Sequence, residues 1–260
     1  RIRKQHLSKK GPTLVPLAFA RANAFHADWS AYAPPAPTFV GRRTLANVDL
    51  APIAECIDWG PFFQAWELSG PYPAILDDPV VGEAARSVLA EGRAMLKRVI
   101  DGRWLTASGT VGFWPANAVG DDIVLWTDES RATPALTWRN LRQQAERPPG
   151  KPHQCLADFV APVGTADYVG AFAVTAGIGI ERKLAEFTQA HDDYSGLMLK
   201  TIADRLAEAF AEWLHRRVRV ELWGYAPDEA LPNDALIREA YRGIRPAPGY
   251  PACPDHAVKA

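Results

Sequence analysis

Apolar residues recur with a helical period in two stretches of the chain. Between Val80 and Ile100 they return at intervals of three and four positions, which is the spacing of one face of an amphipathic α-helix. The residues of this face are Val81, Ala84, Ala85, Val88, Leu89, Met95, Leu96 and Val99. The pattern predicts a helix over 80–100 that stops at Gly102, because glycine is favoured just past a helix C-terminus.

A longer helix is predicted between Ser195 and Arg219. Apolar residues occupy every fourth position there, namely Met198, Ile202, Leu206, Phe210 and Leu214. Asp192 and Asp193 precede this stretch, and carboxylates at a helix N-terminus accept hydrogen bonds from its free N–H groups. We therefore interpret the acidic pair as a helix cap and not as catalytic acids.

Short β-rich runs fill the middle of the chain, each bounded by glycine, proline or aspartate. They are VGFWP at 111–115, DIVLW at 122–126, CLADFV at 155–160 and YVGAFAV at 168–174. The order of helix, strands and long helix lacks the βαβα alternation of a doubly wound parallel sheet. It predicts an α+β fold.

Proline clusters indicate the irregular segments. Pro34, Pro35 and Pro37 lie within 30–40, and their fixed backbone angles favour extended structure over helix or sheet. This segment is predicted to be a linker or a strap on a surface. Residues 1–12 are basic and lack apolar periodicity, so they are predicted to form an arm.

The composition is that of a globular protein. Of the 260 residues, 48% are hydrophobic and 23% are charged, which excludes global disorder. The net charge of −1 gives no overall basic field, so we expect neither nucleic acid nor an anionic membrane as a partner. No apolar run is long enough to span a bilayer, and the N-terminus shows no export signal.

The cysteines and the first residue add context. Cys56, Cys155 and Cys253 are odd in number and far apart, which is typical of a reducing compartment, so we expect a cytoplasmic protein. The chain starts at Arg1 and has no initiator methionine. We therefore expect it to be cut from a longer protein.

Common cofactor and catalytic motifs are incomplete. Gly177-Ile178-Gly179 begins like a dinucleotide fingerprint, but Arg182 stands where the third glycine is needed, so a turn is predicted. No G-x-S-x-G nucleophile elbow is present either.

The cysteine and histidine spacing does not predict a metal site. Cys253 and His256 form one half-site, and His153 with Cys155 forms another of unrecognised spacing. A closed zinc site needs four ligands, usually as two matching pairs. We interpret both half-sites as ordinary loop residues.

The proline-rich segment at 241–256, YRGIRPAPGYPACPDH, is the strongest candidate for a binding site. Its stiffness would present a preorganised surface to a ligand. Arg245 can pair with a carboxylate through its planar guanidinium, and Tyr250 can stack or donate a hydrogen bond. A strap packed on the domain is the alternative interpretation of the same residues.

Ten blocks along the chain share residues and order with one known family. They are IDWGPFFQAW at 57–66, YPAIL at 72–76, WPANAVGDDI at 114–123, LRQQ at 141–144, CLADFVAP at 155–162, DYVGAFAVTAG at 167–177, DDY at 192–194, ADRLAEAFAEWLH at 203–215, WGYAPDE at 223–229 and GIRPAPGYPACPDH at 243–256. From about residue 40 to its end the chain therefore resembles the C-terminal activation domain of cobalamin-dependent methionine synthase.

The resemblance implies an S-adenosylmethionine site at the proline loop. The family's ligand motif corresponds to Arg245, Gly249 and Tyr250, and the aspartate of its D-W-x-P-F-F block corresponds to Asp58. Arg245 suits the α-carboxylate of the ligand, whereas a carboxylate suits its ammonium group or ribose hydroxyls. No acid–base catalytic residue is implied, because the protein mainly positions the methyl group.

Two glutamates are further candidates for this site, Glu208 on the long predicted helix and Glu239 just before the loop. Asp204 and Glu212 lie four residues to either side of Glu208. A solvated acidic helix face is therefore the alternative role for Glu208.

The resemblance also implies the fold and its boundaries. We expect one α+β domain over 40–260, with a twisted, mainly antiparallel sheet flanked by helices. Residues 1–39 would be the linker from a preceding cobalamin-binding module. The family's domain continues past the block that ends in Pro254-Asp255-His256, so a further C-terminal segment is expected beyond Ala260.

The function implied is reactivation of oxidised cobalamin. S-adenosylmethionine would supply the methyl group for reductive methylation of cob(II)alamin, through cob(I)alamin, to methylcobalamin. The parent enzyme would methylate homocysteine with 5-methyltetrahydrofolate, and its zinc and folate belong to other modules.

The implied partners are the cobalamin-binding domain of the same polypeptide and flavodoxin or another reductase. The isolated domain is expected to be inactive alone. A docking module for the reductase or the cobalamin domain, without a ligand of its own, is the alternative.

Overall fold

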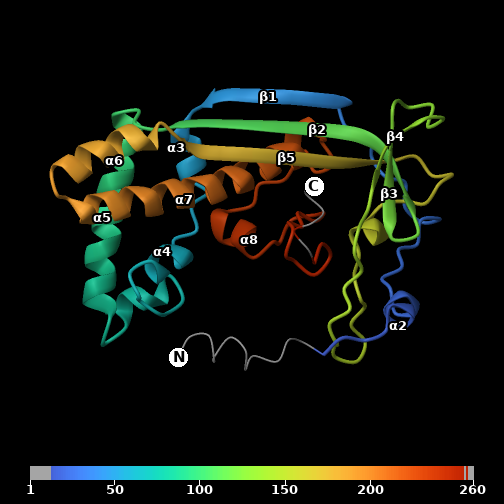
Figure 1. The fold of residues 1–260 in the computed structure, drawn as a ribbon, viewed down its shortest axis with the longest axis horizontal. Coiled ribbons are helices and arrows are strands. Elements are labelled where there is room, and N and C mark those ends of the chain that lie inside the picture. Colours follow the sequence, from blue (N-terminus) through green and yellow to red (C-terminus); the bar gives the residue numbers. More distant parts are fainter. Residues whose placement is uncertain (1–12, 255, 257–260) are drawn as a thin grey trace. The chain divides into compact units, whose positions relative to one another are not determined.

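The computed structural model describes residues 13–254 and 256, and the chain divides into two compact units. Unit 1 takes its described residues from 1–40, 113–170 and 243–260, and unit 2 consists of 41–112 and 171–242. The predicted division into a linker over 1–39 and one domain over 40–260 stays a prediction. Two long strands, β2 (Thr106–Val119) and β5 (Asp167–Ile178), contribute residues to both units (Figure 1).

The five-stranded sheet confirms the predicted α+β class with mainly antiparallel pairing. Its order is β1 (Gly41–Val48), β2, β3 (Asp122–Trp126) and β4 (Pro134–Trp138), and β5 pairs with β2. The β2–β3 and β3–β4 pairs are both antiparallel.

A tight hairpin joins β2 and β3. Val119 lies opposite Asp122, so Gly120 and Asp121 form a two-residue loop between the strands. Gly120 has a φ of 65°, and such short hairpin turns need a residue with positive φ. This turn places Asp121 at the tip of the hairpin.

Helices make up most of unit 2. They are α3 (Leu50–Ala54), α4 (Gly60–Gln64), the 3₁₀ helix η1 (Ala74–Asp77), α5 (Gly82–Asp101), α6 (Ile180–Gln189), α7 (Asp193–Arg217), the π-helical turn η3 (Val218–Leu222) and α8 (Asn233–Ile237). Both predicted helices are confirmed as α5 and α7. The predicted cap is confirmed as well, since the Asp192 carboxylate accepts the N–H of Ser195 at 2.9 Å.

Helix α7 runs beneath the strands of unit 2 (Figure 1), and its apolar stripe is buried. Its five periodic residues are all fully buried, and Phe210 approaches β2 at Gly109. A Cβ atom at Gly109 would lie 3.2 Å from the Phe210 ring, so the small residue allows close packing of helix on strand.

Unit 1 holds β3, β4, the short helix α2 (Leu17–Ala22) and the 3₁₀ helix η2 (Leu156–Phe159). Its buried cluster consists of Ala116, Ile123, Cys155, Leu156, Ala157 and Val160. The segment before α2 pairs with the chain after β4, where the Val15 N–H donates to the Gln144 carbonyl at 2.9 Å. Residues 30–40 contain no helix or strand, as their prolines predicted.

Two sequence predictions about elements differ from the structure, and a third is not tested by it. The strand predicted at 155–160 is wrong, because the Asp158 carboxylate accepts the Cys155 N–H at 2.9 Å and closes the η2 turn. The long helix ends as α-helix at Arg217 and continues as the η3 turn. The predicted arm at 1–12 lies outside the described residues.

Gly102 ends α5 for a reason other than the one predicted. Its φ is −83°, and the left-handed residue is Arg103, with a φ of 47°. A Cβ atom at Gly102 would lie 2.3 Å from the Trp104 indole nitrogen. The glycine is needed because Trp104 approaches closely, and not because of backbone conformation.

None of the helices within the described residues has the length and apolar character needed to cross a bilayer.

Candidate functional site

Asp58 lies in the turn that leads into α4 of unit 2. Its Oδ1 atom accepts the N–H of Gly60 at 2.8 Å, and the side chain is half-buried. Phe62 and Phe63 in the following turn are fully buried and anchor the segment. Within the described residues, the hydrogen bond of this turn involves only the Oδ1 atom of Asp58. The Oδ2 atom can therefore accept a hydrogen bond from an ammonium or hydroxyl group of a ligand.

The turn of Asp58 is tied to helix α8 by Asn233. The Asn233 amide nitrogen donates to the carbonyl of Ile57, the residue before Asp58, at 3.1 Å. These residues are 176 positions apart in the chain, so only the folded unit brings them together.

Glu239 follows the C-terminus of α8 and is exposed. The helix ends in a Schellman motif, in which the Ala240 N–H donates to Ala235 at 3.0 Å and the Glu239 N–H to Leu236 at 2.9 Å. Glu239 occupies the left-handed position of the motif, with a φ of 55°. The backbone thus holds its carboxylate at a defined place next to the helix end.

Glu208 is exposed on α7, where the sequence left two roles open. Its neighbour Asp204 is exposed, as a solvated acidic face predicts, but Glu212 is 7% exposed and lies 3.9 Å from the Arg219 guanidinium. The interpretation of a continuous solvated acidic face is therefore wrong at Glu212. The role of Glu208 as a ligand residue stays a prediction.

The proline loop belongs to unit 1 and forms a tight turn. The Gly249 N–H donates to the Cys253 carbonyl at 2.8 Å, and the Cys253 N–H donates to Tyr250 at 2.9 Å. Gly249 has a φ of 101°, a value that favours glycine. The turn leaves Tyr250 61% exposed, whereas Arg245 is half-buried.

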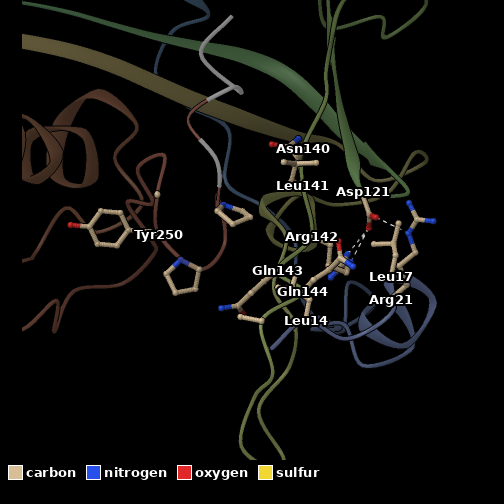
Figure 2. Close-up of a pocket in the computed structure, with 14 residues that line it drawn as sticks. Leu14, Leu17, Arg21, Asp121, Asn140, Leu141, Arg142, Gln143, Gln144 and Tyr250 are labelled. Atoms are coloured by element: carbon tan, nitrogen blue, oxygen red, sulfur yellow. Dashed lines mark hydrogen bonds and ion pairs between the residues drawn. The ribbon is translucent and has the colours of Figure 1, made fainter. Parts of the chain in front are cut away.

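The loop forms one wall of a pocket of about 640 Å³ in unit 1 (Figure 2). The lining residues are Leu14, Leu17, Arg21, Asp121, Asn140 to Ala145, Gly249 to Pro251 and Pro254. Figure 2 shows Tyr250 across the pocket from Asp121 and Arg142. The pocket therefore combines apolar leucine and proline side chains with a charged wall.

The charged wall is a buried ion network centred on Arg142. Its guanidinium donates to Asp121 at 2.7 and 2.9 Å, to Asp158 at 2.6 and 2.8 Å, and to the His153 carbonyl at 2.7 Å. Arg21 of α2 adds a second bond to Asp121 at 2.8 Å. The network joins α2, the β2–β3 hairpin and η2.

The network shifts the pKa values of Asp121 and Arg142. Burial raises the pKa of Asp121, but hydrogen bonds from Arg21 and Arg142 outweigh this effect and hold its pKa below the ordinary value. Burial alone would lower the pKa of Arg142, because it disfavours the charged guanidinium. The carboxylates of Asp158 and Asp121 outweigh this effect, so the pKa of Arg142 is raised. Asp121 and Arg142 are therefore both charged at neutral pH.

The sequence did not single out this network. Arg21 and Asp121 are 100 positions apart, and Arg142 is 21 from Asp121. No local spacing rule detects such a set, although LRQQ at 141–144 was among the blocks of the resemblance.

The described residues contain no group of three histidine, cysteine or acidic side chains placed to hold a metal ion. His153 is buried and bonded through Nδ1 to Asn23 at 2.9 Å, and Cys253 is buried. Of the two half-sites noticed in the sequence, His153, Cys155 and Cys253 are buried, whereas His256 is exposed.

The predicted site residues fall in both units. Asp58, Glu208 and Glu239 belong to unit 2, where Asn233 links the turn of Asp58 to the helix that precedes Glu239. Arg245 and Tyr250 belong to unit 1, and Tyr250 lines the pocket.

Known proteins share this sequence and architecture. A sequence model of the family described as "Vitamin B12 dependent methionine synthase, activation domain" matches residues 49–260. A crystal structure of the MetH reactivation domain bound to AdoHcy is 49% identical in sequence to this chain, with a TM-score of 0.87. That match covers 96% of this chain and 76% of the other chain.

Proposed function

Because the chain belongs to the family of vitamin B12-dependent methionine synthase activation domains, we propose that it binds S-adenosylmethionine. In this role it presents the methyl group for reductive methylation of cob(II)alamin, by way of cob(I)alamin, to methylcobalamin. The observation that carries the proposal is the AdoHcy-bound relative, 49% identical over 96% of this chain. AdoHcy is what S-adenosylmethionine becomes when its methyl group leaves.

The donor set of this chain fits such a ligand. Arg245 binds the α-carboxylate through charge-assisted hydrogen bonds, and Tyr250 stacks or donates a hydrogen bond beside it. Asp58 receives the ammonium group or a ribose hydroxyl at its Oδ2 atom, and Glu208 and Glu239 add negative charge. The carboxylates favour the cationic sulfonium over the neutral product, which promotes release after transfer.

No residue of this chain acts as a general base in the proposed reaction. Cobalamin, held by the neighbouring domain of the same polypeptide, supplies the nucleophile after one-electron reduction by flavodoxin or another reductase. The protein's contribution is to hold the sulfonium methyl in line with that nucleophile, and such positioning is worth several kcal/mol. The activity of the parent enzyme, methylation of homocysteine with methyltetrahydrofolate, belongs to the same proposal.

Calorimetric titration of S-adenosylmethionine into the wild type and an Arg245→Ala variant tests this function. Loss of a charged hydrogen-bond partner is expected to weaken binding by about tenfold or more. Arg42→Ala, which removes the same charge from an exposed position on β1, is the matched control and should bind as the wild type does.

S-adenosylhomocysteine serves as the ligand control and should bind more weakly, because it lacks the sulfonium charge. A folded wild-type protein that binds neither ligand would contradict the proposal and favour the docking module.

A further inference from the structure

A buried polar cluster lies at the end of α7 in unit 2, apart from the residues assigned so far. Its centre is Arg219, which is 0% exposed and sits in the η3 turn. The guanidinium donates to Glu229 through Nε at 2.8 Å and through Nη2 at 2.6 Å, and its Nη1 lies 2.6 Å from His215 Nδ1. The Tyr241 ring faces it at 4.1 Å.

The π-helical turn aims Arg219 into this cluster. His215 and Glu212 precede Arg219 by four and seven positions, so all three lie on one face of the helix. The carbonyl of Arg219 also accepts the N–H of Ala226 at 2.9 Å. Both the backbone and the side chain of Arg219 thus bond to the segment that follows η3.

Arg219 contacts both ends of the segment 229–241. Glu229 begins the segment in a two-pronged ion pair, and Tyr241 ends it with its ring against the guanidinium. Between these anchors lie Asn233, bonded to the carbonyl before Asp58, and Glu239 at the end of α8. One buried side chain therefore contacts both ends of the segment that contains Asn233 and Glu239.

The chemistry of the cluster is better suited to fixing the positions of its residues than to stabilising the fold. Moving a guanidinium and two carboxylates out of water is costly, and apolar residues of similar volume often stabilise a protein at least as well. A planar guanidinium with fixed donor directions, in contrast, defines the positions of its partners closely.

We propose that Arg219 is a positioning residue for S-adenosylmethionine binding, which rests on the proposed function. It acts through Glu229 and Tyr241 on the segment 229–241, and that segment acts through Asn233 on the Asp58 turn. Arg219 does not contact the ligand itself. Asn233→Ala therefore lowers ligand affinity only as long as Asp58 is present to be positioned.

The test compares Asn233→Ala and Glu229→Gln with Asp58→Ala in double-mutant cycles, read by calorimetric titration of S-adenosylmethionine. Each single variant is expected to weaken binding by about three- to tenfold, which corresponds to one lost hydrogen bond. Combined with Asp58→Ala, Asn233→Ala should cause no further loss, because the two residues act in series. Near-ultraviolet circular dichroism verifies that each variant is folded.

Asn23→Ala is the matched structural control. It removes a comparable side-chain bond, from Asn23 to the Lys151 carbonyl at 3.0 Å, in unit 1. It should lower the unfolding temperature and leave ligand affinity unchanged. Arg219→Lys, where it folds, should behave as Glu229→Gln does.

The outcomes separate this proposal from the proposed function. Wild-type binding that is lost in Arg245→Ala but retained in Asn233→Ala and Glu229→Gln overturns the positioning role alone. A loss in Asn233→Ala that adds to that of Asp58→Ala overturns it as well. A folded wild type that does not bind overturns both.

Discussion

At the scale of single residues, Glu239 combines a backbone cost with a proposed binding role. Left-handed conformation costs a residue with a Cβ atom about 1–2 kcal/mol, and glycine is the usual occupant of this position in a Schellman motif. His191 after α6 occupies an equivalent position, with a φ of 54°.

Glu239→Gly should therefore stabilise the protein and weaken its ligand binding. We expect about 0.5–1 kcal/mol more stability in urea unfolding, since relief of strain exceeds the added chain entropy. Binding of S-adenosylmethionine should weaken because the carboxylate is lost. Glu239→Ala separates the two effects, since it removes the carboxylate and keeps the strain.

His191→Gly is the matched control for the backbone effect. It should give a similar stability gain with ligand binding unchanged. Glu239 would have no part in binding if Glu239→Gly and Glu239→Ala both bound as the wild type does.

At the scale of elements, the approach of α5 to α4 shapes the surroundings of Asp58. Gly92 lies in the interior of α5, and a Cβ atom there would come within 2.5 Å of the Phe62 ring on α4. Phe62 is fully buried and contacts the indole of Trp59, the residue after Asp58. A glycine in the middle of a helix normally weakens that helix. Here the close packing of α4 and α5 requires the glycine.

Gly92→Ala should destabilise the protein by about 1–3 kcal/mol, because the added methyl group overpacks the α4–α5 contact. It should also weaken S-adenosylmethionine binding by displacing the α4 turn. Urea unfolding and calorimetry measure the two effects.

Gly196→Ala on α7 is the comparison for this substitution, since the nearest atom to its Cβ would be a Leu184 methyl at 3.9 Å. Alanine there should stabilise the protein by about 0.5–1 kcal/mol through helix propensity. Equal effects of the two substitutions would contradict the packing argument.

The elements themselves followed from the sequence to different degrees. The periods of four and of three-and-four residues predicted α7 and α5, because a long apolar stripe is a local property. The run at 155–160 has the apolar content of a strand, yet the Asp158 carboxylate turns it into η2. Short apolar runs do not distinguish strand from buried turn, since the deciding hydrogen bond is a single side-chain contact.

At the scale of the whole molecule, carboxylate groups tie stability to pH. Hydrogen bonds donated by serine or backbone groups lower the pKa values of the exposed residues Asp28, Asp78 and Asp128 and of the half-buried Asp192. In unit 1, burial raises the pKa of Asp121, but hydrogen bonds and charges from Arg21 and Arg142 lower it by more, so the net shift is downward. Asp167 is the opposite case, because burial raises its pKa.

The protein should therefore lose stability in acid. A carboxylate whose folded-state pKa is lowered stabilises the fold above its unfolded pKa, near 3.8, and this contribution is lost as the pH falls through the folded value. The free energy of unfolding in urea should be flat near neutral pH and fall below about pH 4.

Asp121→Asn should reduce the slope of this acid limb, because it removes one of the responsible carboxylates. It should also lower stability at neutral pH, since Arg21 and Arg142 lose a charged partner. An acid limb unchanged by the substitution would show that Asp121 does not contribute to it.

The sequence by itself determined the α+β class, the two long helices, the cap at Asp192, and the family to which Asp58, Arg245 and Tyr250 point. Helical periods, caps and turns depend on residues a few positions apart, so a linear pattern contains them. Only the tertiary structure decided that Arg142 joins Asp121 and Asp158, that Arg219 anchors the segment 229–241, and that Asn233 reaches the carbonyl before Asp58. Charged groups leave water only when their partners are already in place, and those partners come from parts of the chain that only folding brings together.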